Sequence, residues 1–227
     1  MARQVRSHHW VDRKVLIGAI AAILGGIIGG WVQAYAWYYL ERQRAAAEKR
    51  EQWTVTALQW ANRGRVETFR HADLRGADLQ GVDLGPGESA GEDSKGADLS
   101  YANLQGANLS FANLTRVELG RADLSKALIP ETTLAEADLL GADLHETLLI
   151  AADLSRATLC KANLSEAHLG HADLRGANLA GATFEDASLT GADLSGANLE
   201  GAEVTDEQLA QARSLKGAIM PDGTMHD

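Results

Sequence analysis

Residues 97–111 read ADLSY-ANLQG-ANLSF, and the five-residue unit that begins there continues without a slip in register to Asp206. In its 22 copies, the first position is Ala 19 times and the third position is Leu 19 times. The second position is Asp or Asn in most copies, and Gly recurs at the fifth. A fixed period decides the fold before any other feature, because every copy must adopt the same local structure.

A period of five fits neither an ordinary helix nor an ordinary strand. On an α-helix, five residues turn by about 500°, so successive Leu side chains would be offset by about 140° and would form no apolar face. On a plain strand, an odd step moves the Leu from one face to the other. The chain must therefore turn once per unit. Four right-angled turns make a square coil with Ala and Leu inside, stacked about 4.8 Å from the next coil. This solenoid fits the pattern better than an array of Ala/Leu-rich helices.

The motif A-(D/N)-L-x-x resembles that of the pentapeptide-repeat family. The resemblance implies an all-β fold, a right-handed quadrilateral β-helix, over residues 66–206. We expect side-chain oxygens at the second position to bond neighbouring backbone in the turns, and Gly at the fifth position to tolerate unusual φ angles. Short capping helices should cover the ends of the coil, which would otherwise present unpaired backbone.

Residues 85–96 interrupt the repeat. The five-residue period holds up to Leu84, but the next stretch is rich in Gly and charge and contains Pro, which is typical of a loop. We predict that this loop is expelled from the wall and that the coil resumes at Leu99. Residues 87–91 read GESAG and match the G-x-S-x-G nucleophile pattern, which needs a strand before the serine and a helix after it. Neither is expected, so the motif does not indicate catalysis.

No other feature indicates an enzyme, a cofactor or a metal site. His168 and His171 lack a third ligand nearby, so they are weak evidence for a metal. A filled prism offers no pocket for a substrate. The single Cys160 excludes an internal disulfide.

Residues 15–40 are predicted to span a membrane. The stretch 15–32 carries no charge and is almost wholly apolar, which is long enough for a transmembrane helix. Trp and Tyr lie where interfacial aromatic residues belong. Basic residues on both sides leave the orientation open. The prediction is a single-pass protein of a bacterial inner membrane or an equivalent membrane. A signal peptide cleaved after Ala36 and a helix buried in a soluble core are the alternatives.

The remaining segments flank the membrane span and the repeat. Residues 1–14 form a basic N-terminal segment, and residues 41–65, rich in helix formers, form a helical stalk and an N-terminal cap. Residues 207–227 form a C-terminal cap and tail. The sequence TDEQ at 205–208 matches a capping box, which predicts a short helix running roughly to Ala212.

Charge is unevenly distributed along the chain. The net charge is −10, but residues 1–65 carry +6 and residues 66–206 carry −15. An acidic body argues against nucleic acid as a ligand of the repeat.

Residues twenty apart should lie above one another on one side of the coil. On the side that carries Leu109, Ile129 and Leu149 inward, large apolar residues also occupy outward positions. We call this set the apolar patch: Phe111, Leu128, Pro130, Leu148 and Ile150. Exposed apolar patches often mark binding surfaces, so we expect a protein partner or a second copy of the chain there. Cover by the loop or by a tail is the alternative.

The neighbouring side carries many carboxylates. We call six of them the acidic stripe: Asp123, Asp143, Glu146, Glu166, Glu185 and Asp186. Such a stripe attracts basic partners or metal ions, although a merely solvated face would have the same composition.

These features favour a membrane-tethered, non-enzymatic scaffold or protein–protein interaction module. The resemblance also implies an alternative. One subgroup of the family, the quinolone-resistance proteins, binds DNA gyrase with an acidic β-helix dimer that looks like duplex DNA. The acidic body fits that alternative, and the predicted membrane segment argues against it.

Overall fold

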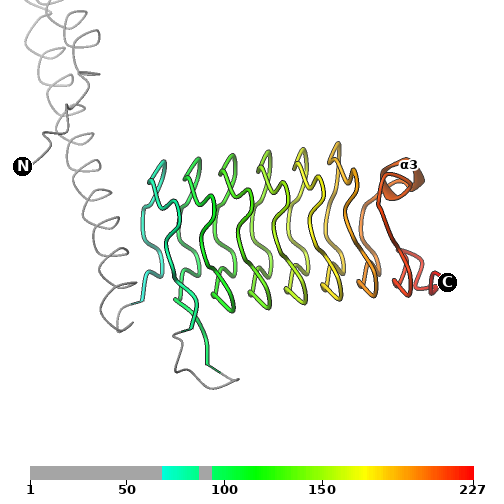
Figure 1. The fold of residues 1–227 in the computed structure, drawn as a ribbon, viewed down its shortest axis with the longest axis horizontal. Coiled ribbons are helices and arrows are strands. Elements are labelled where there is room, and N and C mark those ends of the chain that lie inside the picture. The colour runs from blue at the N-terminus through cyan, green and yellow to red at the C-terminus, as the bar shows by residue number, and fades with distance from the viewer. Residues whose placement is uncertain (1–67, 87–93) are drawn as a thin grey trace, which may run out of the picture. The chain divides into compact units, whose positions relative to one another are not determined.

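The computed structural model describes residues 68–86 and 94–227, all within the second of two compact units of the chain, Arg50–Asp227. These residues form a stack of similar coils (Figure 1). Each side of a coil contributes an isolated bridge residue, and these bridges are parallel except for one at the C-terminal end. Within the described residues the only helix is α3, Asp206–Leu209. The predicted all-β coil is therefore confirmed for this part of the chain.

Successive coils are in register at twenty residues. Asp123 pairs with Asp143, and Asp143 pairs with Asn163. Up to the last coil, the N–H of a third-position residue donates to a second-position carbonyl of the next coil, as Leu124 does to Asp143 at 2.7 Å. This ladder defines four faces, which we number by their inward columns. Face 1 includes Leu99 and Leu119, face 2 Leu104 and Leu124, face 3 Leu109 and Ile129, and face 4 Leu114 and Leu134.

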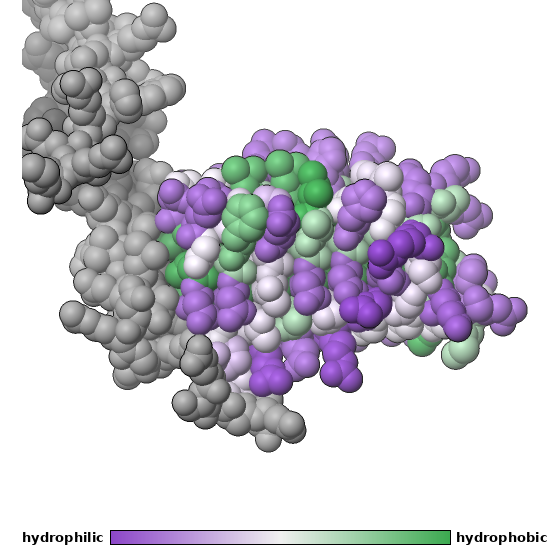
Figure 2. Space-filling model, viewed as in Figure 1, coloured by the Kyte–Doolittle hydropathy of each residue, from purple (hydrophilic) through white to green (hydrophobic). Residues whose placement is uncertain are grey.

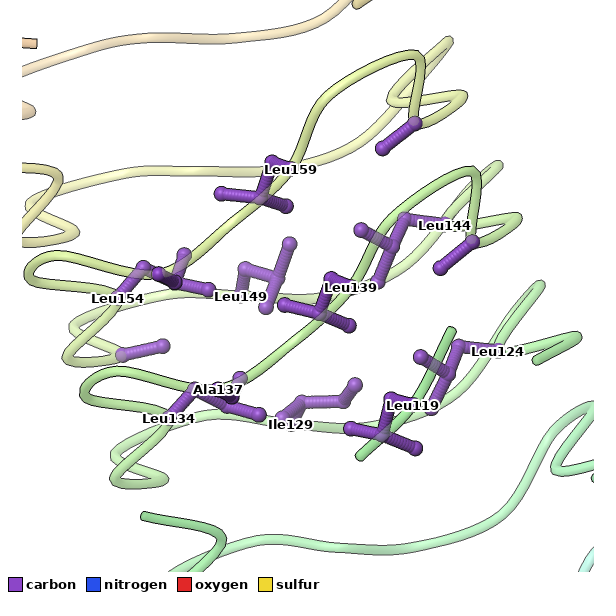
Figure 3. Packing of buried hydrophobic residues seen from close by; sticks show 14 of the residues in the cluster. Leu119, Leu124, Ile129, Leu134, Ala137, Leu139, Leu144, Leu149, Leu154 and Leu159 are labelled. Atoms are coloured by element: carbon purple, nitrogen blue, oxygen red, sulfur yellow. The ribbon is translucent and has the colours of Figure 1, made fainter. Parts of the chain in front are cut away.

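Leu and Ala side chains fill the interior of the coils. Figure 3 shows the inward side chains of one coil stacked on those of the next, among them Leu119, Leu124, Ile129, Leu134, Leu139, Leu144, Leu149 and Leu154. Two units carry Thr in place of Ala at the first position. Thr132 and Thr147 are buried, and their hydroxyls donate to the carbonyls of Leu109 and Leu124 at 2.7 and 2.9 Å. The exceptions therefore leave no buried hydroxyl unsatisfied.

Each corner of the coil is a β-turn. The first-position N–H returns to the preceding third-position carbonyl, as Ala127 does to Leu124 at 3.0 Å. Fifth-position residues from Tyr101 to Gly201 all have positive φ, which is the geometry of a type II turn. Glycine adopts this conformation freely. Fifteen non-glycine residues adopt it as well, at a cost of roughly 1–2 kcal/mol each. The expectation of unusual φ at the fifth position is confirmed.

Asp and Asn at the second position bond a backbone donor that the ladder does not use. In the described coils with Asp or Asn at the second position, the fourth-position N–H donates to that side chain. Asp123 accepts from the N–H of Ser125 at 3.0 Å, and Asp153 accepts from that of Ser155 at 2.9 Å. These Asx-type turns confirm the predicted role of the second position.

The interruption at 85–96 is accommodated at one corner. Bridges from the first coil span thirty residues instead of twenty, as between Asp83 and Asn113. The N–H of Ala97 donates to the carbonyl of Leu84 at 2.8 Å, which is the bond of an ordinary corner. The ladder is therefore continuous across the interruption, and the expulsion of the loop stays a prediction, because residues 87–93 lie outside the described residues. The GESAG segment, 87–91, lies outside the described residues.

The α3 helix takes the place of face 3 in the last coil. Thr205 caps it, because its side chain accepts from the N–H of Gln208 and the Gln208 side chain accepts from the N–H of Thr205. The Gln208 carboxamide also donates to the carbonyl of Ala187 at 3.0 Å. In the other coils a backbone N–H makes this bond, so Gln208 replaces the missing wall. The predicted capping box is confirmed.

The chain returns to the ladder soon after α3. The helix ends at Leu209 rather than near Ala212, because Arg213 donates to the carbonyl of Ala192 at 2.7 Å and Ser214 resumes the parallel bridges. The last bridge is antiparallel, between residues 219 and 225, and it closes the end of the stack.

The expectation of a single-pass membrane protein is corrected by the structure. In the described ranges, 68–86 and 94–227, no helix is long and apolar enough to cross a bilayer, since α3 has four residues and a span needs about twenty. The predictions for residues 1–14, 15–40 and 41–65 lie outside the described residues.

Candidate functional site

The five residues of the apolar patch lie together on face 3. Leu128 and Leu148 form a parallel bridge. The N–H of Phe111 donates to the carbonyl of Pro130 at 3.1 Å, which places the Phe111 corner beside Pro130. Phe111 is 54% exposed, Leu128 40% and Ile150 46%, while Leu148 and Pro130 are partly buried. The structure thus brings the predicted residues together, and their binding role stays a prediction.

The local sequence explains how apolar residues replace the usual Asp or Asn here. Leu128 precedes Pro130 by two positions, and proline has no N–H that needs an acceptor. Proline also favours the second residue of a type II turn, which is the place Pro130 occupies. In the next coil, Leu148 leaves the N–H of Ile150 without a hydrogen bond to any described residue. The patch therefore replaces part of the polar wall.

Half of the acidic stripe is engaged in local hydrogen bonds and ion pairs. Asp123 accepts from the hydroxyl of Ser125 at 2.6 Å, and Asp143 accepts from the amide of Asn163 at 3.0 Å. Glu146 lies 3.2 Å from the Lys126 ammonium and 3.0 Å from the His145 ring. The hydrogen bond from Lys126 holds the pKa of Glu146 below its ordinary value. These carboxylates stabilise the wall.

The other half of the stripe is exposed. Glu166, Glu185 and Asp186 make no side-chain hydrogen bond or ion pair with the described residues. Two of them, with Glu203 and Gln208, line an open groove of about 760 Å³ beside α3. The stripe therefore divides into an engaged half and an unpaired half toward the C-terminal end.

The corner beside face 3 carries the Lys126–Glu146 ion pair next to the apolar patch and unpaired carboxylates in the two coils that follow. The corner between faces 2 and 3 carries Lys126, Glu146, Glu166 and Asp186 in successive coils, each two residues before an outward position of face 3. At the opposite corner, Glu131 is exposed and its side chain has no partner among the described residues. In the view of Figure 2 the coils are largely hydrophilic, with apolar residues gathered in a few places. Face 3 thus has an apolar end, with Glu131 at one corner, and a polar end that is bordered by Glu166 and Asp186.

Two exposed apolar residues were not identified from the sequence. Leu140 on face 1 is 45% exposed, and Tyr101 at its corner is 41% exposed. The Tyr101 ring stacks on His71 at 5.0 Å between centroids, and the guanidinium carbons of Arg70 and Arg121 lie 5.5 and 5.8 Å from its centroid. Such cation–π contacts hold the ring against the wall. The twenty-residue register that located the patch would have placed Leu140 outward too.

In the part of the chain that the structure describes, no three His, Cys, Asp or Glu side chains are arranged to hold a metal ion. His168 and His171 are both exposed on the side of the apolar patch.

Square coils with inward Ala and Leu, positive-φ corners and single-residue parallel bridges define a quadrilateral β-helix. The family model for pentapeptide repeats matches eight copies, over residues 68–85, 95–128, 131–165 and 167–206, which is more than half of the chain. The chain therefore belongs to the pentapeptide-repeat family.

The chain is also similar to solved structures. HetL, a pentapeptide repeat protein involved in heterocyst differentiation regulation in the cyanobacterium Nostoc sp. strain PCC 7120, is 31% identical, with 74% of this chain and 97% of HetL covered and a TM-score of 0.38. Two trypsin-treated variants of QnrB1, a plasmid-mediated fluoroquinolone resistance protein, are 23% and 24% identical, with 68% of this chain and 78% of theirs covered and a TM-score of 0.51. The likeness to QnrB1 shows the fold alone. No curated protein matches.

Proposed function

We propose that this chain is a non-enzymatic scaffold that binds a protein partner through the apolar patch. The observation that carries the proposal is the exposure of Phe111, Leu128 and Ile150 at outward positions. The interior of the coil does not need these side chains, and Leu128 and Leu148 stand where Asp or Asn would bond the backbone. Pentapeptide repeat proteins are generally structural or interaction modules, which supports the proposal.

The size of the patch makes it an anchor rather than a whole interface. Burial contributes about 25 cal/mol per Å², so an exposed patch of roughly 200–300 Å² is worth about 5–7 kcal/mol before costs. Association costs about 4–15 kcal/mol, so further contacts around the patch must contribute.

The test is crosslinking and pull-down with the full chain. In the double variant Leu148→Glu with Ile150→Lys, neither changed side chain enters the interior, so the fold should be kept and the partner lost. The matched control is Thr158→Glu with Cys160→Lys, which changes the same two positions of a unit on face 1. The control should keep the partner. A folded patch variant that still captures the same partner would overturn the proposal.

The acidic stripe supports a second candidate function, protection of a DNA gyrase. The observation in its favour is the run of unpaired carboxylates Glu166, Glu185 and Asp186, on a body of net charge −15. If this function holds, the full chain should preserve gyrase supercoiling in the presence of a fluoroquinolone. If supercoiling is equally inhibited with and without the chain, the second candidate is discarded.

A further inference from the structure

We propose that the segment which docks on face 3 is a basic amphipathic α-helix of three to four turns, lying along the stack. This inference rests on the proposed function and specifies the chemistry of the partner.

The dimensions of face 3 suit one helix. The outward residues at the second and fourth positions of a unit lie roughly 7 Å apart, which sets the width of the face. Successive coils are about 4.8 Å apart along the stack. The strip begins at the coil of Phe111 and ends at that of Thr190, whose hydroxyl donates to Gln211, just after α3, at 3.2 Å. These five coils offer a strip about 19 Å long. At 1.5 Å per residue, such a strip accommodates about 13 residues of helix.

The apolar patch occupies one end of this strip. Phe111 lies in the first of the five coils, Leu128 and Pro130 in the second, and Leu148 and Ile150 in the third. They therefore span about 10 Å along the axis. Apolar residues at i, i+4 and i+7 of a helix cover the same length, and helix-in-groove recognition uses such anchors.

The other end of the strip is polar and acidic at its edge. The fourth and fifth coils carry His168 and Ser188 outward, and both are bordered by the unpaired carboxylates of Glu166 and Asp186. Glu131 adds a carboxylate on the opposite corner. A partner helix should therefore carry Lys or Arg beside its apolar stripe, in the turns that follow the anchors. These cations would complement the edge that carries Glu166 and Asp186, while a cation beside the anchors would complement Glu131.

Other occupants are disfavoured by the same charges. A second copy would bring its own acidic edges and a body of −15 against this one. The exposed apolar area is also far below the roughly 800 Å² per partner of a stable dimer. Phosphates of nucleic acid or of anionic lipid would meet like charge at both edges.

The experiment uses fluorescence anisotropy with the full chain and three labelled 14-residue peptides. The first is a Leu/Lys helix with Leu at i, i+3, i+4 and i+7, the second has Glu in place of Lys, and the third is a scrambled Leu/Lys peptide of the same composition. The border variant is Glu166→Gln with Asp186→Asn. Its matched control is Glu200→Gln with Asp138→Asn, which removes one exposed Glu and one exposed Asp from face 1.

The first peptide should bind the wild-type chain, and the other two should bind at least tenfold more weakly. Leu148→Glu with Ile150→Lys should abolish binding. The border variant should weaken it about fivefold to tenfold, and the control variant should stay within twofold of wild type. Raising the salt concentration should reduce the difference between border and control variants.

Three outcomes would overturn the inference. If border and control variants lose binding equally, the attraction is general to an acidic surface. If the Leu/Glu peptide binds as well as the Leu/Lys peptide, the partner is not basic. If the wild-type chain dimerises through face 3, as shown by loss of dimer in the patch variant, the occupant is a second copy. The crosslinking experiment with the patch variant is independent of these peptide measurements. Binding of a protein partner through the apolar patch can therefore hold even if the partner segment is not a basic helix.

Discussion

Faces 3 and 4 share a backbone and an interior but differ in what they present to solvent. On face 4, Asp173 pairs with Arg175 at 2.6 Å and Asp193 pairs with Arg213 at 2.8 Å. On face 3, Leu128 and Leu148 occupy the corresponding outward positions, and their side chains can form no hydrogen bond. The first and third positions of the unit therefore determine the fold. The outward positions vary more from copy to copy, and where apolar residues replace the usual polar ones we expect recognition of a partner.

The largest effect should come from the interior. Leu144→Lys places an unpaired ammonium on the axis of the coil, because Leu144 has no exposed surface. The expected loss of stability is about 3–5 kcal/mol, enough to unfold the middle of the stack. Ser155→Lys is the control, since this fourth-position side chain points outward, and it should change stability by less than about 0.5 kcal/mol. Equal melting temperatures for the two variants would contradict the register.

A smaller effect should come from the polar wall of face 4. Asp193 accepts from the N–H and hydroxyl of Ser195 at 3.0 and 2.6 Å and pairs with Arg213. Asp193→Ala should lower the unfolding free energy by roughly 1.5–3 kcal/mol, as measured by urea denaturation. Asp138→Ala on face 1 loses only the bond from the Leu140 N–H, at 3.0 Å, and should cost about 1 kcal/mol or less. A larger loss of unfolding free energy for Asp138→Ala than for Asp193→Ala would show that second-position side chains do not stabilise the coil through these hydrogen bonds and ion pairs.

Acid should weaken face 4 selectively. Hydrogen bonds from Arg175 and from Ser195 hold the pKa values of Asp173 and Asp193 below their ordinary values. The folded state therefore favours the carboxylates, so their stabilisation is present above the unfolded pKa of about 3.9 and is lost as the pH falls further. Urea midpoints of the Asp193→Asn variant should depend less on pH than those of wild type between roughly pH 5 and pH 2. An unchanged slope would show that Asp193 does not titrate differently on folding.

At the corners, replacing Ala by Gly and replacing Gly by Ala should change the stability of the fold in opposite directions. Ala151 has φ of +55° and Gly106 has φ of +63°, and a Cβ at Gly106 would meet no atom within 4 Å. Ala151→Gly should therefore stabilise by up to about 1 kcal/mol, and Gly106→Ala should destabilise by a similar amount. Thermal melting distinguishes the two, and shifts of the same sign would contradict the turn geometry.

The interior was predictable because the repeat is strict. The register of Leu99 follows from its position in a fixed period, and the capping box at Thr205 follows from the sequence TDEQ at 205–208. The exposed Leu140 obeys the same period and was overlooked. The ion pair between Lys126 and Glu146 was not predictable from the sequence, because long side chains can adopt several rotamers. The membrane prediction relied on residues outside the repeat, where no periodic register constrains the structure.

The most direct test of the account is Leu148→Asn, with unfolding and partner crosslinking measured on the same preparation of the full chain. Asn at this position can accept from the N–H of Ile150, as second-position residues do elsewhere, and this bond should offset the lost apolar contact with Leu128. We predict a change of less than about 1 kcal/mol in stability together with loss of the crosslinked partner. A large fall in stability would show that the patch belongs to the fold. An unchanged partner would show that recognition lies elsewhere.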